Sequence, residues 1–337
     1  MNTRFLLWGL LVAVCLPSCS EKDKSGEGDR LSSRDSTSTR AARPRKNDAP
    51  RELTLDLGNG VTMELALIPP GTFLMGSAAD VFNNEEPMHQ VKLSKPFYMG
   101  LTPVTVAQFS AFAKASGHTT GAEKAGSSMG IETRDGKLRL KAVAGVSWRN
   151  PSFDQGGNHP VVQVSWNDAK AFCHWLSQKS GKGVRLPTEA EWEYACRAGT
   201  RSEWPWGEES ETGKGRANCG DRSLKKRCPR DQGRGGFFDW EDGFVCTSPV
   251  AAFRPNAFGL YDMIGNVWEW CEDFYGRYGG DAIRDPAGPD NGTLRVSRGG
   301  SWSRGPMDCR SARRVEVPPN VRSVDIGFRV VVTADVN

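Results

Sequence analysis

The stretch from Thr200 to Gly300 limits the possible folds more than any other part of this sequence. It shows almost no helical or strand periodicity, and glycine, asparagine, aspartate and aromatic residues make up nearly half of it. Irregular runs of this length are usually functional, or they are held by something other than a hydrogen-bonded ladder. We therefore expect a domain with little regular secondary structure, held together by metal ions, disulfides and buried tryptophans.

Regular patterns are short and lie mostly outside this stretch. Strand-like segments are expected at Met63–Ile68, Phe73–Met75, Trp268–Trp270, Leu294–Ser297 and Gly327–Val332. Helical periodicity is expected over Thr105–Gly117, Ser165–Ser177 and Thr188–Gly199. In the last of these segments, Thr188 and Glu191 have the spacing of a capping box. The mixture predicts an α/β (α+β) fold.

The first nineteen residues predict a bacterial lipoprotein signal peptide. Arg4 gives a positive n-region, and Phe5–Leu16 is an apolar run too short to span a bilayer. Cys19 ends a Leu-Pro-Ser-Cys sequence that resembles a lipobox, so we expect Cys19 to carry a lipid after cleavage. An ordinary secretory signal cut nearby is the alternative. The lipoprotein interpretation implies export and anchoring to a bacterial envelope membrane.

Residues 20–51 predict a disordered tether. Serine, basic and acidic residues alternate there with almost no large apolar side chain, so no core can offset the chain entropy. The folded domain is therefore expected over residues 52–337. The whole chain carries 44 Lys and Arg against 40 Asp and Glu, without a long basic run. This distribution argues against a nucleic-acid partner, which requires basic residues clustered on one face.

Export implies an oxidising compartment, in which cysteines are candidates for disulfides. Beyond the signal peptide there are seven: Cys173, Cys196, Cys219, Cys228, Cys246, Cys271 and Cys309. An odd number leaves at least one thiol free or paired outside the chain.

A series of sequence blocks, taken in order, resembles the formylglycine-generating enzyme (sulfatase-modifying factor) family. The blocks are Ile68–Gly76, His159–Trp166, Arg185–Tyr194, Gly259–Trp270, Arg298–Trp302 and Gly327–Arg329. Each block alone is a weak signal, whereas their order and spacing across residues 52–337 are specific. The resemblance implies a C-type-lectin-like domain with little regular structure.

The resemblance implies a copper-dependent oxidase only in part. Active enzymes of this family oxidise a sulfatase cysteine, in a Cys-x-Pro-x-Arg sequence, to formylglycine with oxygen and a copper ion held by two cysteines. The first copper cysteine follows the serine of Gly-Gly-Ser, here Ser301, by three residues, and that position is Arg304. Cys309 lies five residues later and is a copper ligand only if the protein is active. One thiolate cannot hold Cu(I) linearly, and the charge of Arg304 repels it, so we do not expect copper.

The resemblance also implies two calcium sites built from side-chain and backbone oxygens. The first set is Asn218, the Cys219 carbonyl, Asp242 and the Phe244 carbonyl. The second set is Asp262, the carbonyls of Gly265 and Val267, and Glu269. Calcium accepts about six to eight oxygens in flexible geometry, so loops rich in turn residues suit it. The alternative is that these carboxylates are solvated loop residues.

For the disulfides, the resemblance implies a bridge between Cys196 and Cys309 that joins the third helix to the C-terminal segment. Cys173 is expected to stay a buried free thiol, which behaves as a small hydrophobic side chain. The pairing of the others is left open: Cys219, Cys228, Cys246 and Cys271.

Three functions are compatible with these features. The first is a membrane-anchored envelope protein whose calcium-binding domain binds a protein or small-molecule ligand, through a pocket at Ser301, Trp302 and Arg304. The second is a copper-dependent oxidase that acts on a sulfatase cysteine. The third is a structural docking component of an envelope complex. The lipid anchor, the retained calcium residues and the missing first copper cysteine favour the first function over the second. The sequence barely separates the first function from the third, and the identity of the ligand is left open.

Overall fold

The computed structural model describes residues 51–78, 82–228 and 236–334 of the chain. The expected signal peptide, the lipidation site Cys19 and all but the last residue of the expected tether lie outside the described residues. Within the described ranges, no helix is long and apolar enough to cross a membrane.

Short strands dominate the described part of the chain, and helices are few. The strands are β1 (Glu52–Gly58), β2 (Val61–Ile68), β3 (Gly71–Met75), β4 (His89–Leu93), β5 (Phe97–Gly100), β6 (Ser127–Arg134), β7 (Lys137–Ala144), β8 (Val184–Arg185), β9 (Trp268–Phe274), β10 (Ile283–Arg284), β11 (Arg295–Arg298), β12 (Arg314–Val317), β13 (Ile326–Gly327) and β14 (Val331–Thr333). The helices are α1 (Val106–Ser116), α2 (Gly121–Ala125), α3 (Trp166–Ser180), α4 (Glu189–Arg197) and α5 (Arg222–Arg227), with 3₁₀ turns at Asn83–Glu85 and Ser210–Gly213. This arrangement confirms the predicted α/β (α+β) class.

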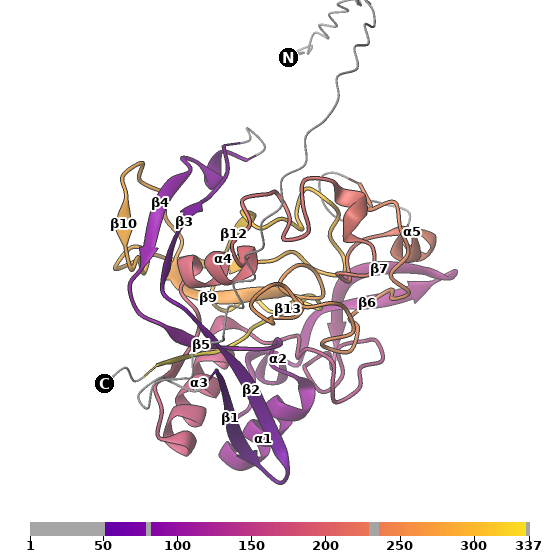
Figure 1. The fold of residues 1–337 in the computed structure, drawn as a ribbon. Helices are drawn as coiled ribbons and strands as arrows, with labels where there is room; N and C mark the ends of the chain where they lie inside the picture. The colour runs from indigo at the N-terminus through magenta and orange to yellow at the C-terminus, as the bar shows by residue number, and fades with distance from the viewer. Residues whose placement is uncertain (1–50, 79–81, 229–235, 335–337) are drawn as a thin grey trace, which may run out of the picture. The chain divides into compact units, whose positions relative to one another are not determined.

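A five-stranded sheet, in the order β1-β2-β5-β14-β8, joins the two ends of the domain (Figure 1). Strand β14 lies between β5 and β8 and runs antiparallel to both. Helices α1 and α3 pack against this sheet and against each other. A second, four-stranded sheet has the order β12-β11-β9-β13, so β12 is an edge strand. The remaining strands form the sheet β10-β4-β3 and the separate hairpin β6-β7.

Local sequence signals place the three main helices where they were expected. Thr105, Ser165 and Thr188 each begin a helix with a capping box, in which the cap hydroxyl accepts a bond from the backbone N–H three residues later. The apolar faces of α1 and α3 then meet, and the rings of Phe109 and Phe172 lie stacked with centroids 6.1 Å apart. Residues close in sequence therefore determine these helices.

The expected single strand over Gly327–Val332 is wrong, because the segment is divided between two sheets. Strand β13 pairs with β9 in parallel, whereas β14 pairs with β5 and β8. Arg329 lies between the two strands and is fully buried. Its guanidinium donates to the Glu269 carboxylate at 2.6 and 2.8 Å. The chain passes from one sheet to the other at this ion pair.

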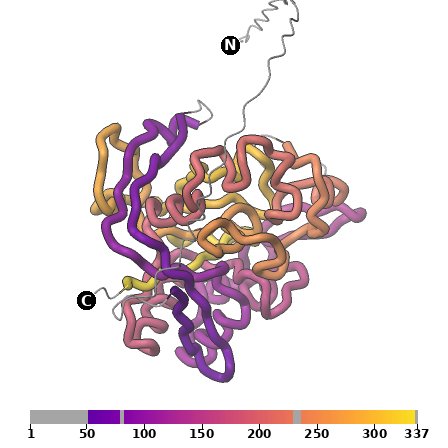
Figure 2. The backbone as a smooth tube through the Cα atoms, viewed as in Figure 1, coloured from indigo at the N-terminus to yellow at the C-terminus, as the bar shows by residue number. Residues whose placement is uncertain are grey.

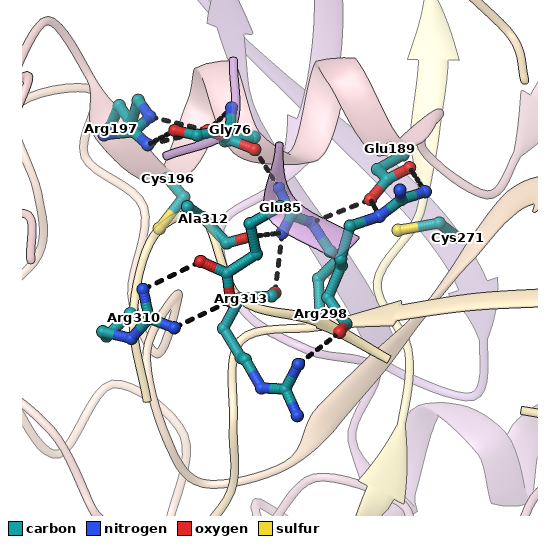
Figure 3. Close-up of polar contacts among 12 residues, drawn as sticks. Gly76, Glu85, Glu189, Cys196, Arg197, Cys271, Arg298, Arg310, Ala312 and Arg313 are labelled. Carbon is teal, nitrogen blue, oxygen red and sulfur yellow. Dashed lines mark hydrogen bonds and ion pairs between the residues drawn. The ribbon is translucent and has the colours of Figure 1, made fainter. Parts of the chain in front are cut away.

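Buried arginine–glutamate pairs secure the loop that follows β11. Arg310 donates to Glu85 at 2.7 and 2.9 Å, and Arg314 donates to Glu189 with two bonds of 2.7 Å. Figure 3 shows Arg310 facing Glu85. A charge removed from water needs such paired and hydrogen-bonded partners. These ion pairs hold the loops in a way that the sequence analysis did not predict.

Aromatic stacking holds the loops between Thr200 and Gly300, whose path Figure 2 traces and which connect the short elements α5, β9, β10 and β11. The rings of Trp204 and Trp206 are stacked with centroids 6.2 Å apart, and those of Phe238 and Trp240 with centroids 4.1 Å apart. Trp204 and Trp240 are buried and Trp206 is partly buried, in line with the expected role of tryptophans in this stretch.

Candidate functional site

A cleft of about 910 Å³ lies beside the edge strand β12. Residues from β9, β12, β13 and nearby loops line it: Phe82, Asn83, Asn84, Trp268, Arg304, Asp308, Arg313, Val315, Glu316, Val317, Val321, Ser323, Asp325 and Ile326. Apolar side chains and charges of both signs therefore share one cleft. Its volume falls within the range of ligand-binding pockets.

Arg304 lines this cleft, as expected of a pocket residue. Its Nε lies 3.8 Å from Asp325 Oδ2, and its side chain is 29% exposed. A second ion pair, between Arg313 Nε and Asp308 Oδ1 at 2.9 Å, lines the same cleft. Carboxylates thus fix the positions of two positive charges at the cleft surface.

Ser301 and Trp302 lie behind the cleft wall and do not line it, which corrects the expected pocket. Ser301 is fully buried, and its hydroxyl donates to Asp325 Oδ2 at 3.1 Å. The indole N–H of Trp302 donates to the Val324 carbonyl at 3.2 Å. Both residues hold the segment that carries Asp325, and Asp325 in turn faces Arg304.

Asp325 is a site residue that the sequence analysis missed. Besides Ser301, the hydroxyl of Ser303 donates to its Oδ2 at 2.9 Å, and that of Ser323 donates to its Oδ1 at 2.6 Å. A sequence signal was available, because Asp325 stands two residues before the Gly327–Arg329 block. A carboxylate so close to a family block is a candidate polar support for that block.

The expected disulfide between Cys196 and Cys309 is not present, and none of the seven cysteines of the described residues is in a disulfide. Cys196 lies against Ser311, and its thiol is 3.9 Å from the Met263 carbonyl. Cys309 is fully buried, and its thiol donates to the Arg304 carbonyl at 3.2 Å. The predicted bridge is wrong because Ser311, and not Cys309, lies beside Cys196. Cys309 precedes Ser311 by two residues.

The first expected calcium set comes together around Asp242. Its Oδ2 accepts a bond from Cys219 N at 2.9 Å, and its Oδ1 accepts one from Phe244 N at 2.8 Å. The side-chain oxygen of Asn218 is buried and has no hydrogen-bond partner among the described residues. Burial, together with repulsion from Asp221, raises the pKa of Asp242 to about 7. A half-buried carboxylate and an unpaired amide oxygen one residue from its partner Cys219 fit a hard cation such as Ca²⁺.

The second expected calcium set fits the ion less well, because Glu269 is already engaged. Its Oε2 accepts a bond from Trp192 Nε1 at 2.8 Å, and Arg329 donates to both of its oxygens. Asp262 Oδ2 accepts a bond from Ala251 N at 2.8 Å, whereas its Oδ1 is buried without a hydrogen-bond partner in the described ranges. Burial raises the pKa of Asp262 to about 6. Asp262 is therefore the one carboxylate of this set that has an oxygen available to bind Ca²⁺.

In the part of the chain that the structure describes, no group of three or more His, Cys, Asp or Glu side chains could hold a metal ion. Both calcium sets therefore depend on amide and carbonyl oxygens. These come from Asn218, Cys219 and Phe244 in the first set and from Gly265 and Val267 in the second.

Short strands, few helices and long loops around a cleft define a formylglycine-generating-enzyme-like domain with a C-type-lectin-like fold. Residues 58–334 match the family model described as the sulfatase-modifying factor enzyme 1-like domain, and the chain belongs to this family. It is 40% identical over 294 residues to the formylglycine-generating enzyme of Streptomyces coelicolor, covering 80% of this chain and 88% of that protein. It is 35% identical over 306 residues to the inactive C-alpha-formylglycine-generating enzyme 2 of Bos taurus, covering 82% and 90%.

Solved structures show the same fold. PvdO from Pseudomonas aeruginosa is similar with a TM-score of 0.65 and 31% identity, over 85% of this chain and 100% of that chain. The variable protein 1 of Treponema denticola is similar with a TM-score of 0.64 and 26% identity, over the same shares. Because the relatives include both enzymes and a protein named as inactive, the activity must be argued from the site itself.

Proposed function

We propose that this domain binds an extended polypeptide segment of a partner protein in the cleft beside β12, without oxidising it. The observation that carries the proposal is the position of β12, which is the edge of its sheet and also lines the cleft. An exposed edge can accept one more strand, whose main chain supplies the affinity. Arg304 stands in the same cleft, at the position where the family resemblance places the first copper cysteine.

The ladder between β9, β11 and β12 decides which backbone groups face the cleft. Tyr275 N donates to Leu294 O at 2.9 Å, so the backbone of Leu294 faces β9. The backbone N–H and C=O groups of successive residues in a strand point alternately to its two neighbours. The backbone groups of Ser297 therefore face β12, where the register partner of Ser297 is Val315. The backbone of Val315 is thus used within the sheet.

Glu316, the next residue, is left with its N–H and C=O directed away from β11. The same alternation applies to Arg314, and its carbonyl does accept a bond from outside the sheet, from Asn84 Nδ2 at 3.2 Å. Glu316 lines the cleft. A polypeptide laid along β12 can therefore pair with the main chain of Glu316.

The proposal predicts a specific effect of proline at position 316. A library of extended peptides would be screened against the protein, and fluorescence anisotropy would give the Kd of the strongest binder. Glu316→Pro removes the outward N–H but no ladder bond, so the fold should persist while the Kd rises by roughly tenfold or more. The matched control Glu316→Ala keeps the N–H and should change the Kd by no more than about threefold.

Two results would overturn this binding mode. One is a peptide that binds Glu316→Pro as tightly as the wild type, with both proteins showing the same melting temperature. The other is the failure of every peptide in the library to bind the wild type.

A copper-dependent oxidase, the second candidate, is supported by one observation. The thiol of Cys219 is in contact with that of Cys309, so a second thiol does lie beside the possible copper ligand. Both cysteines, however, are 0% exposed. A substrate cysteine must reach the copper, and two wholly buried sulfurs give it no access. Non-oxidising binding is therefore the better supported function.

We further propose that Ca²⁺ binds at the first set, through Asn218, Asp242 and the carbonyls beside them. Support comes from the unpaired buried oxygen of Asn218 and the raised pKa of Asp242. We also propose that a lipid on Cys19 anchors the domain to a bacterial envelope membrane. Here the support is the apolar run and the lipobox-like sequence that end at Cys19.

A further inference from the structure

Two cysteines from loops far apart in the sequence meet next to the cleft wall. Cys219 precedes α5, and Cys309 lies in the loop between β11 and β12. Both are 0% exposed, and the two thiols lie close enough to interact with each other. Asp308, the neighbour of Cys309 in the chain, lines the cleft.

Two glycines make room for the two sulfur atoms. A Cβ on Gly300 would lie 2.5 Å from Cys309 Sγ, and a Cβ on Gly265 would lie 2.8 Å from Cys219 Sγ. Both glycines also have positive φ angles, of 73° and 80°, which other residues rarely adopt. The Gly265 N–H donates to Gly299 O at 2.9 Å, so the two glycine segments are joined. The fold thus builds one shared space for this pair of sulfurs.

Both cysteine loops also converge on the backbone of Arg304. The Arg304 carbonyl accepts a bond from Gly220 N at 2.8 Å and one from the Cys309 thiol at 3.2 Å. A Cβ on Gly220 would lie 3.0 Å from the same carbonyl group, so the approach is close. Both cysteine loops therefore contact the backbone of Arg304, which lines the cleft.

We propose that Cys219 and Cys309 form a disulfide in the exported protein, which ties the Asn218 loop to the cleft wall. This inference rests on the proposed export, because a disulfide needs an oxidising compartment. The oxidant is a low-molecular-weight or protein disulfide. Two thiols lose two protons and two electrons, one S–S bond forms between Cys219 and Cys309, and the oxidant is released as two thiols. Since both sulfurs are buried in the fold, the exchange takes place before the two loops close.

Peptide mapping of the full chain, exported with its own signal sequence, tests this proposal directly. Free thiols are blocked with iodoacetamide, and the protein is digested with trypsin without reduction. Cleavage at arginine gives the short peptides Ala217–Arg222 and Gly305–Arg310. Mass spectrometry should find these two peptides linked to each other, and separate after reduction. The peptide that contains Cys196 should carry the blocking group.

Thermal unfolding gives a second readout. A disulfide that closes a loop of this length should raise the melting temperature by roughly 10 °C, and a reductant should remove that gain. Cys219→Ser, Cys309→Ser and the double variant should all lose the gain equally and show no response to reductant. Cys173→Ser is the matched control, because Cys173 is equally buried in α3, and it should respond to reductant as the wild type does.

Three results would overturn the proposal. The first is separate blocked peptides for Cys219 and Cys309, even after refolding with oxidised glutathione. The second is a bond from Cys309 to Cys196. The third is one Cu(I) or Zn²⁺ ion per chain in native mass spectra, lost in Cys219→Ser, which would make the pair a metal site. Because the mapping does not depend on peptide binding, its failure is distinct from failure of the proposed cleft function.

Discussion

The family resemblance and the structure assign different partners to Glu269. The resemblance assigns Glu269 to a calcium site, whereas in the fold both carboxylate oxygens accept bonds from Arg329 and one also accepts from Trp192. Arg329 is 0% exposed, so it depends on this partner for its charge. A substitution of Glu269 would therefore break the ion pair with Arg329, and its effect on stability could not be assigned to calcium alone.

Glu269→Ala is expected to lower the free energy of unfolding by roughly 3–5 kcal/mol, because it leaves the guanidinium of Arg329 buried and unpaired. Urea denaturation measures this loss. The matched control is Asp239→Ala, which removes the pair with Arg222 at 2.6 Å, where the side chains are 71% and 51% exposed. That change should cost less than about 1 kcal/mol. Equal losses in the two variants would contradict the structural role given to Glu269.

Calcium is better tested at Asp242, whose side chain forms no ion pair with an arginine among the described residues. Calcium at about a hundred times its Kd should stabilise the wild type by roughly 2.7 kcal/mol and raise its melting temperature by several degrees. Asp242→Asn should abolish most of this increase. A melting temperature that stays the same after a chelator has removed all metal would contradict the proposed site.

Elements that depend on neighbouring residues were predictable from the sequence, and those that depend on distant partners were not. The capping boxes at Thr105, Ser165 and Thr188 fixed the starts of three helices, because the bonded groups are three residues apart. The division of the last strand depends on Arg329 meeting Glu269, sixty residues away. No local pattern carries that information.

The hairpin β6-β7 was missed although its signal is local. Asp135 and Gly136 join the strands, with φ angles of 52° and 71°. An Asp-Gly pair at the turn is a strong indication of a tight hairpin, since both residues tolerate positive φ. Of the candidate site, the sequence placed Arg304 in the cleft but not Asp325 or the edge of β12. Both line the cleft although β12 and β13, which Asp325 precedes, are opposite edges of the sheet β12-β11-β9-β13, and no local pattern carries that arrangement.

At the scale of the whole molecule, the described domain and the N-terminal segment serve different parts of the proposed function. The domain offers a cleft with an edge strand, and Cys19 would hold that cleft at a membrane surface. If the partner is attached to the same membrane, anchoring of this domain raises the effective concentration of each protein for the other.

Cys19→Ser is expected to move the protein from the membrane fraction to the soluble envelope fraction, because a lipid chain is the proposed attachment. Fractionation followed by immunoblotting measures the shift, and metabolic labelling with a fatty acid tests the lipid itself. Cys15→Ser is the control, since Cys15 lies in the apolar run and should leave the distribution unchanged. A wild type that carries no lipid and is already soluble would refute the anchor.

The central claim, binding without oxidation, is tested most directly by mass spectrometry of a sulfatase-type peptide containing Cys-x-Pro-x-Arg. The peptide is incubated with the full chain, Cu(I), oxygen and a reductant, beside the Streptomyces coelicolor relative as a positive control. We expect no conversion of cysteine to the aldehyde, because Arg304 stands at the first copper position and the thiols of Cys219 and Cys309 are buried. Conversion by the wild type that Cys309→Ala abolishes would contradict the claim and make Cys309 a catalytic ligand.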